Sequence, residues 1–112
     1  MTNEKYDKKG KIISLQQWVA LMEDKEYKRV AETTVGRYWV STVWLGLDHN
    51  WGGVKPLIFE SMVFDKKTNE SDLLTDRYST LSQALVGHDN MVKKVGTFTF
   101  RYNQWLRKIP WR

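Results

Sequence analysis

The chain has 112 residues, a formal net charge of +5 and no cysteine. This length suits one domain with a single core, and the lack of cysteine excludes a disulfide framework and a thiolate metal site. With 41% hydrophobic and 28% charged residues, the composition is typical of a globular protein and excludes wholesale disorder. No apolar run approaches the roughly eighteen residues of a membrane span, and the polar N-terminus lacks the apolar core of a signal peptide. We therefore expect a cytoplasmic protein that does not contact a membrane.

The charge is unevenly distributed along the chain. Residues 1–30 contain seven basic and five acidic side chains, residues 31–92 contain five and eight, and residues 93–112 contain six basic and no acidic ones. A mildly acidic body followed by a basic tail argues against a nucleic-acid-binding face spread over the whole domain. If the protein binds nucleic acid, this charge distribution places the binding site in the C-terminal segment.

The first predicted element is a helix near the N-terminus. Residues 1–13 are polar and rich in lysine, so we expect a flexible segment there. Ser14 and Gln17 then form a capping box, in which each side chain satisfies a backbone N–H of the first helical turn. Apolar residues follow at the spacing of one helical face, and they predict an amphipathic helix over about residues 15–25.

Three strands are predicted in the middle of the chain. Residues 28–35 are the first, and Gly36-Arg37 is predicted to be the turn that follows. Residues 38–47 give the strongest pattern, because β-branched and aromatic side chains occur on both of its faces. Residues 57–64 form the third strand, in which Glu60 is a carboxylate inside an apolar run. A carboxylate in that position needs a partner or an edge.

A second helix is predicted from a second capping box, Thr80 with Gln83, and it extends to about Val95. His88 lies within its apolar stripe. The neighbouring Gly87 costs about 1 kcal/mol relative to alanine in a helix interior. That cost indicates that another group approaches the helix backbone at Gly87.

The order of the predicted elements is α-β-β-β-α, followed by a tail. It predicts an α+β fold in which a small antiparallel sheet of three to four strands packs with two helices, in a single domain over residues 14–96. Residues 97–112 form a basic aromatic C-terminal segment. The alternation of Thr97, Phe98, Thr99 and Phe100 makes the start of this segment a candidate for an added strand.

Four polar residues are candidates for catalysis or metal binding: Asp48, His49, Glu60 and His88. His49, Glu60 and His88 have the ligand types for a divalent ion such as Zn²⁺, Mn²⁺ or Fe²⁺, and the same groups can act as general acid and base. Structural roles account for the residues as well. Asp48 and Asn50 favour turns, His49 suits an exposed loop, and His88 suits a core histidine bonded to Glu60 or to a carbonyl. No H-x-H or H-x-x-x-H spacing supports a metal site, so we favour the structural roles.

Other residues are candidates for contact with a partner. Trp51 lies among turn formers and glycines, where burial is hardest, and we take it and Asn50 as contact candidates. In the tail, basic and aromatic side chains alternate as they do in proteins that bind single-stranded nucleic acid or anionic surfaces. The nucleic-acid candidates are Arg101, Tyr102, Trp105, Arg107, Lys108, Trp111 and Arg112. In the alternative interpretation Trp105, Leu106 and Ile109 dock on the domain and leave the charges in solvent.

Four motifs carry a resemblance to small proteins predicted in phage and prophage genomes: STVWLGLDH (41–49), PLIFESMVF (56–64), RYST (77–80) and ALVGH (84–88). In those proteins closely similar motifs recur in the same order, and the resemblance covers about residues 36–92. It implies no established activity, but it singles out Asp48, His49, Glu60, Arg77, Tyr78, Gly87 and His88. Arg77 and Tyr78 thereby join the contact candidates. The basic aromatic tail departs from the family pattern, so a function of the tail does not carry over.

Three functions are consistent with the sequence. The first and favoured one is a non-enzymatic phage accessory protein that inhibits, sequesters or redirects a host or defence protein. The second is a small metal-dependent hydrolase or nuclease that uses His49, Glu60 and His88, with Asp48, to activate water. The third is nucleic-acid binding through the tail. Exposed strand edges and surplus aromatic residues would also suit a homodimer.

Overall fold

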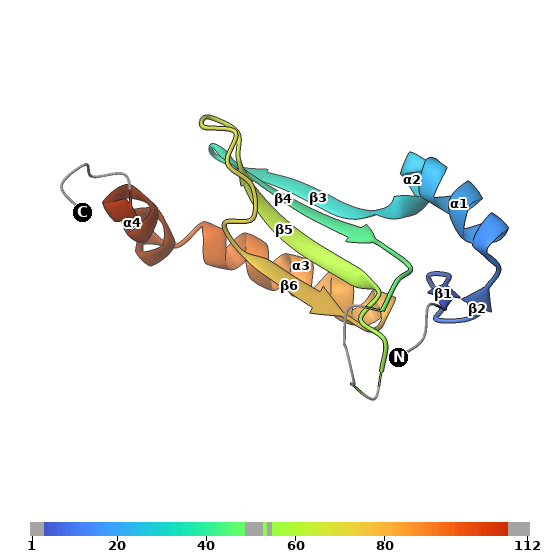
Figure 1. The fold of residues 1–112 in the computed structure, drawn as a ribbon. Coiled ribbons are helices and arrows are strands. Elements are labelled where there is room, and N and C mark those ends of the chain that lie inside the picture. Colours follow the sequence, from blue (N-terminus) through green and yellow to red (C-terminus); the bar gives the residue numbers. More distant parts are fainter. Residues whose placement is uncertain (1–3, 49–52, 54, 108–112) are drawn as a thin grey trace.

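A four-stranded antiparallel sheet forms the centre of the molecule in the computed structural model, which describes residues 4–48, 53 and 55–107 (Figure 1). Its strands are neighbours in space in the order of the sequence: β3 (Arg29–Val35), β4 (Tyr38–Trp44), β5 (Phe59–Asp65) and β6 (Thr75–Tyr78). Gly36, with a φ of 61°, supplies the positive dihedral that the two-residue turn between β3 and β4 requires. The predicted α+β class and antiparallel sheet are confirmed.

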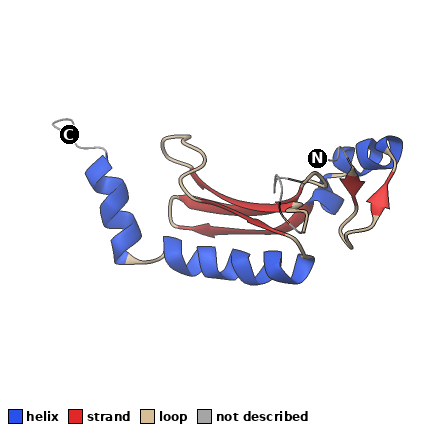
Figure 2. Ribbon diagram, turned by 60° about the horizontal axis from the view of Figure 1, so that its bottom comes forward, coloured by secondary structure: helices blue, strands red, loops and turns tan. Residues whose placement is uncertain are grey.

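One long helix, α3 (Leu81–Val95), covers one face of the sheet (Figure 2). It begins where the second capping box predicts, since the Thr80 hydroxyl accepts the N–H of Gln83. Every second residue of β4 and β5 is buried on this face: Tyr38, Val40, Thr42, Trp44, Phe59, Ser61, Val63 and Asp65. The alternate residues are only partly buried, because no described helix lies over the opposite face.

The core has two parts along the length of α3. Near the N-terminus of α3, one cluster consists of Trp44, Ile58, Phe59, Tyr78 and Ala84, and side chains of the N-terminal elements pack against it. Near the C-terminus of α3, the other cluster consists of Tyr38, Val40, Val63, Met91, Val95 and Phe100. The helix is therefore fixed to the sheet at both ends.

The N-terminal segment, for which we expected flexibility, forms a hairpin of β1 (Lys5–Tyr6) and β2 (Ile12–Ile13) in its described part. Backbone and side-chain bonds connect this hairpin to the end of the large sheet. The Tyr6 N–H donates to the Gly46 carbonyl at 2.9 Å, and Trp44 Nε1 donates to the Tyr6 carbonyl at 3.0 Å. These long-range bonds order a segment whose own composition is that of a mobile terminus.

The first predicted helix, over about residues 15–25, corresponds to α1 (Leu15–Glu23), which begins at the predicted capping box. A second short helix that was not predicted, α2 (Lys25–Lys28), follows it directly. Asp24 separates them, because its backbone closes α1 while its side chain accepts the N–H of Tyr27 and so caps α2. Both helices lie at one end of the sheet and leave its second face uncovered (Figures 1 and 2).

α4 (Phe98–Arg107) occupies the segment in which we predicted an added strand over residues 97–100, so that prediction was wrong. The Thr97 hydroxyl accepts the N–H of Phe100 at 3.2 Å, which is the bond of a helix N-cap. Phe100 then packs edge-on against Tyr38, with ring centroids 5.2 Å apart. A four-residue alternation is too short to outweigh this local cap and the docking of one aromatic ring.

Candidate functional site

Glu60 and His88 lie on opposite faces of the sheet. Glu60 pairs with Val43 and Arg77 on the neighbouring strands, and its carboxylate accepts from Arg77 Nε at 3.1 Å on the uncovered face. His88 projects from α3 onto the covered face and is 3% exposed. Because the strand register places Glu60 in the outward set of β5, the two side chains do not converge on one metal ion.

No group of three or more metal-binding side chains gathers within residues 4–48, 53 and 55–107. His49, the third predicted ligand, lies outside the described residues, as do Asn50, Trp51, Lys108, Trp111 and Arg112. Asp48 has a structural contact, since its Oδ1 accepts the N–H of Leu57 at 3.1 Å across the base of the loop. This bond agrees with the interpretation of Asp48 as a loop-forming residue.

His88 belongs to a buried chain of hydrogen bonds under α3. Its Nδ1 lies 2.7 Å from the Thr42 hydroxyl and its Nε2 lies 2.9 Å from the Thr33 hydroxyl, while Thr42 also bonds to Ser61. Burial lowers the pKa of His88, and the charge of Asp89 opposes this effect only in part. The imidazole is therefore neutral near pH 7, with a hydroxyl at each ring nitrogen. This is the environment of a core histidine that orients a helix on a sheet.

Gly87 allows Tyr78 to pack directly on the backbone of α3. A Cβ at position 87 would lie 2.1–2.3 Å from the Tyr78 ring and hydroxyl. The prediction that another group approaches the backbone at Gly87 is thus confirmed. The Tyr78 hydroxyl is buried and has no hydrogen bond of good geometry within the described part of the chain. Burial raises the pKa of Tyr78, and the nearby Ser61 hydroxyl offsets this only partly.

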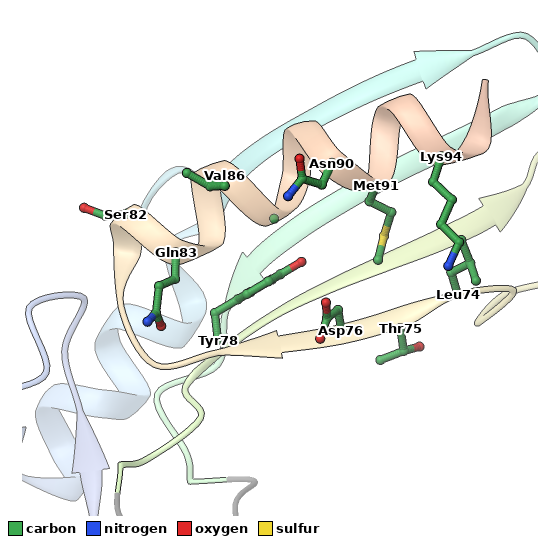
Figure 3. A pocket seen from close by; sticks show the side chains of 11 residues that line it. Leu74, Thr75, Asp76, Tyr78, Ser82, Gln83, Val86, Asn90, Met91 and Lys94 are labelled. Atoms are coloured by element: carbon green, nitrogen blue, oxygen red, sulfur yellow. The ribbon is translucent and has the colours of Figure 1, made fainter. Parts of the chain in front are cut away.

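A groove of about 510 Å³ runs between the edge strand β6 and α3 (Figure 3). Tyr78 lies across the space between the two elements, and Leu74, which precedes β6, lines the groove beside it together with Val86 and Met91 of α3. The polar lining residues are Thr75, Asp76, Ser82, Gln83, Asn90 and Lys94. Asp76 and Lys94 are the charged members of this lining. A groove with an apolar lining and a few polar groups is a candidate binding site.

The uncovered face of the sheet, which we call the open face, is the feature that our sequence interpretation missed. Strand register places on it Glu32, Thr34, Trp39, Ser41, Val43, Glu60, Met62, Phe64, Thr75 and Arg77. Trp39 and Phe64 are cross-strand partners with ring centroids 4.9 Å apart. Ion pairs flank the apolar centre, Glu60 with Arg77 on one side and Glu32 with Arg29 on the other. The apolar residues on both faces of β4 were the feature of the sequence that could have revealed it.

The C-terminal helix presents a second surface. Phe100 and Gln104 are buried against the domain, whereas Tyr102 is 45% exposed and Trp105 is 59% exposed. One interpretation of the tail required Trp105 to dock on the domain, and its exposure shows that it does not. Leu106 is partly buried, and Ile109 lies outside the described residues.

The comparisons add no relative. Neither a family model, nor a curated protein, nor a solved structure matches this chain. None of the described helices combines the length and the apolar character that a membrane crossing requires.

Proposed function

We propose that the chain is a small phage-type accessory protein that binds and modulates a host or defence protein through the open face, without catalytic activity of its own. The observation that carries this proposal is the uncovered apolar centre of the sheet, formed by Trp39, Val43, Met62 and Phe64. The phage assignment rests on the resemblance of the four sequence motifs.

The open face has the layout of a protein interface. Its centre is apolar and contains an aromatic pair, Trp39 with Phe64, and aromatic residues are enriched among those that dominate binding energy. Its margins contain the two ion pairs, with Arg77 43% exposed and Glu60 14% exposed. Charges at the rim of an interface contribute more to partner choice and association rate than to affinity. The apolar centre would therefore supply most of the affinity.

The size of the face limits what it can do alone. Four strands of up to seven residues span roughly 19 by 23 Å at usual strand spacing and rise, which gives roughly 440 Å². A standard interface takes about 800 Å² from each partner. The partner therefore covers the open face and also extends over surface next to it.

The surroundings of the polar candidates support binding over catalysis. His88 is buried between two threonines, Asp48 closes a loop, and Glu60 is paired with Arg77. Each of these groups has a structural partner in place of an open position for substrate or metal. The proposal accordingly assigns them to the scaffold.

The test compares two lysine substitutions on different surfaces. Met62→Lys puts a charge in the middle of the open face, and Val86→Lys puts one on α3, where Val86 is 61% exposed beside the groove. Circular dichroism first checks that both variants fold. Affinity purification from bacterial host cells should recover one stoichiometric host protein with wild type and with Val86→Lys, and Met62→Lys should lose it.

Two outcomes would contradict the proposal. If Met62→Lys retains the partner while Val86→Lys loses it, the groove is the binding site and the open face is not. If light scattering shows a wild-type dimer that Met62→Lys converts to a monomer, a second copy of this chain occupies the open face in place of a host protein.

A further inference from the structure

We propose that α4 and the adjoining β3–β4 turn bind single-stranded nucleic acid. This inference is independent of the proposed function, because it concerns a different surface with a different charge. It rests on three observations: the exposed aromatic pair of α4, the basic residues around it, and the way in which α4 is held on the domain.

The aromatic pair is oriented toward solvent. Tyr102 and Trp105 are one helical turn apart, with ring centroids 5.9 Å from each other, and they are 45% and 59% exposed. Arg101 lies on the same side of the helix, four residues before Trp105. Nucleic-acid bases stack on such exposed rings regardless of their sequence, because every base has an aromatic face.

The charge around this pair complements a polyanion. Among the described residues from 93 to 107 the basic side chains are Lys93, Lys94, Arg101 and Arg107, and no side chain is acidic. Arg101 and Arg37 line a hollow of about 300 Å³ over Gly36 in the β3–β4 turn. Arg37 is fixed there by two bonds to the Asp65 carboxylate, at 3.0 and 2.7 Å. Within the described residues Arg101 forms no ion pair, so it is available to a phosphate.

Basic and aromatic residues can bind an anionic membrane as well as nucleic acid. The docking of α4 on the domain favours nucleic acid as the ligand. A helix that lies in a membrane surface inserts one apolar side. In α4 the side that contains Phe100 and Gln104 is already buried against the domain, where Phe100 packs on Tyr38. The exposed side presents the Tyr102–Trp105 ring pair next to Arg101, which suits unstacked bases and their phosphates.

The test is fluorescence anisotropy of labelled twelve-nucleotide oligo(dT) and oligo(U) with the full chain. We expect binding at low salt that weakens as salt is raised. Trp105→Ala and Tyr102→Ala should each weaken it by about five- to a hundredfold, the usual effect of losing a stacking ring. Arg101→Gln should weaken it and reduce the salt slope by about one. Leu85→Ala, a substitution of an exposed residue on α3, is the matched control and should leave the affinity unchanged.

Several results would overturn the inference. The first is that neither oligonucleotide binds at low salt. The second is that the affinity is unchanged when both Tyr102 and Trp105 are replaced by alanine. The third is that duplex DNA of equal length binds as tightly as the single strand. Binding to vesicles rich in phosphatidylserine without binding to either oligonucleotide would assign the surface to membranes. Met62→Lys should leave oligonucleotide binding intact, so a failure of the proposed function and a failure of this inference are distinguishable.

Discussion

Replacing Gly87 with alanine tests the contact that fixes α3 on the sheet. Alanine is favoured over glycine by about 1 kcal/mol in a helix interior, so an uncrowded site would be stabilised. The new Cβ, however, would lie 2.1 Å from Cε1, 2.2 Å from Cζ and 2.3 Å from the hydroxyl oxygen of Tyr78. Forcing a methyl group into a packed core costs about 1–3 kcal/mol. The Tyr78 ring is rigid and its hydroxyl is buried. After the helix gain of about 1 kcal/mol is subtracted, we expect the free energy of unfolding to fall by up to about 2 kcal/mol.

The assay is urea unfolding followed by circular dichroism, with Gly96→Ala as the control. Gly96 ends α3 with a φ of −75°, and its Cβ would meet no atom closer than 3.5 Å, so Gly96→Ala should leave stability unchanged or slightly raise it. In a Tyr78→Leu background, which removes the distal ring atoms and the hydroxyl, Gly87→Ala should become stabilising. If Gly87→Ala raises the free energy of unfolding in the wild-type background, the close packing of Tyr78 on α3 would be refuted.

Three further predictions concern charges and caps. Burial lowers the pKa of His88 in the folded state below its unfolded value near 6.5. Below about pH 7 the unfolded chain therefore binds more protons than the folded chain, and the free energy of unfolding falls as the pH drops toward the lowered pKa. In denaturation curves measured between pH 7.5 and 5, the free energy of unfolding of His88→Asn should fall less steeply with decreasing pH than that of wild type. An equal dependence on pH in the two proteins would contradict the buried position of His88. Arg37→Met leaves the Asp65 carboxylate, which is 1% exposed, without its cation. Because Arg37 is itself 35% exposed, we expect the free energy of unfolding to fall by about 2 kcal/mol, less than the roughly 3–5 kcal/mol that breaking a fully buried pair costs. A fall of less than about 0.5 kcal/mol would argue against the bidentate contact. Ser14→Ala should cost about 1 kcal/mol and speed amide exchange in α1, whereas unchanged exchange would show that the capping box contributes nothing.

Local features of the fold were predictable from the sequence. Both capping boxes mark true helix starts, because a cap is a contact between residues three positions apart. The β3–β4 hairpin was predictable from Gly36 between two β-rich segments. These elements are specified by neighbouring residues, and no knowledge of the tertiary fold is needed to find them.

The elements that were missed depend on distant partners. β6 has the sequence Thr-Asp-Arg-Tyr, which lacks apolar alternation, and it is a strand because it pairs with β5. The N-terminal hairpin is likewise ordered by bonds to Gly46 and Trp44. Pairing of this kind overrides local propensity, and a single sequence does not reveal the partner.

The arrangement of the candidate site depended on strand register, which the sequence left undetermined. Had β5 been shifted by one residue, Glu60 would have faced His88 under α3 in place of Arg77 on the open face. The same register puts Trp39 and Phe64 side by side on the open face. The sequence predicted that two helices pack with the sheet, whereas α3 alone covers one face and α1 and α2 lie at the end of the sheet (Figures 1 and 2).

The central claim is that the open face binds another protein, and photo-crosslinking tests it most directly. Benzoylphenylalanine is introduced in place of Met62 in one chain and in place of Val86 in another, and both are irradiated in host cells. The account predicts that the chain with the crosslinker at position 62 forms one discrete adduct with a host protein and that the chain with it at position 86 does not. Equal adducts from both positions, or none from position 62 while the chain remains folded, would contradict the claim.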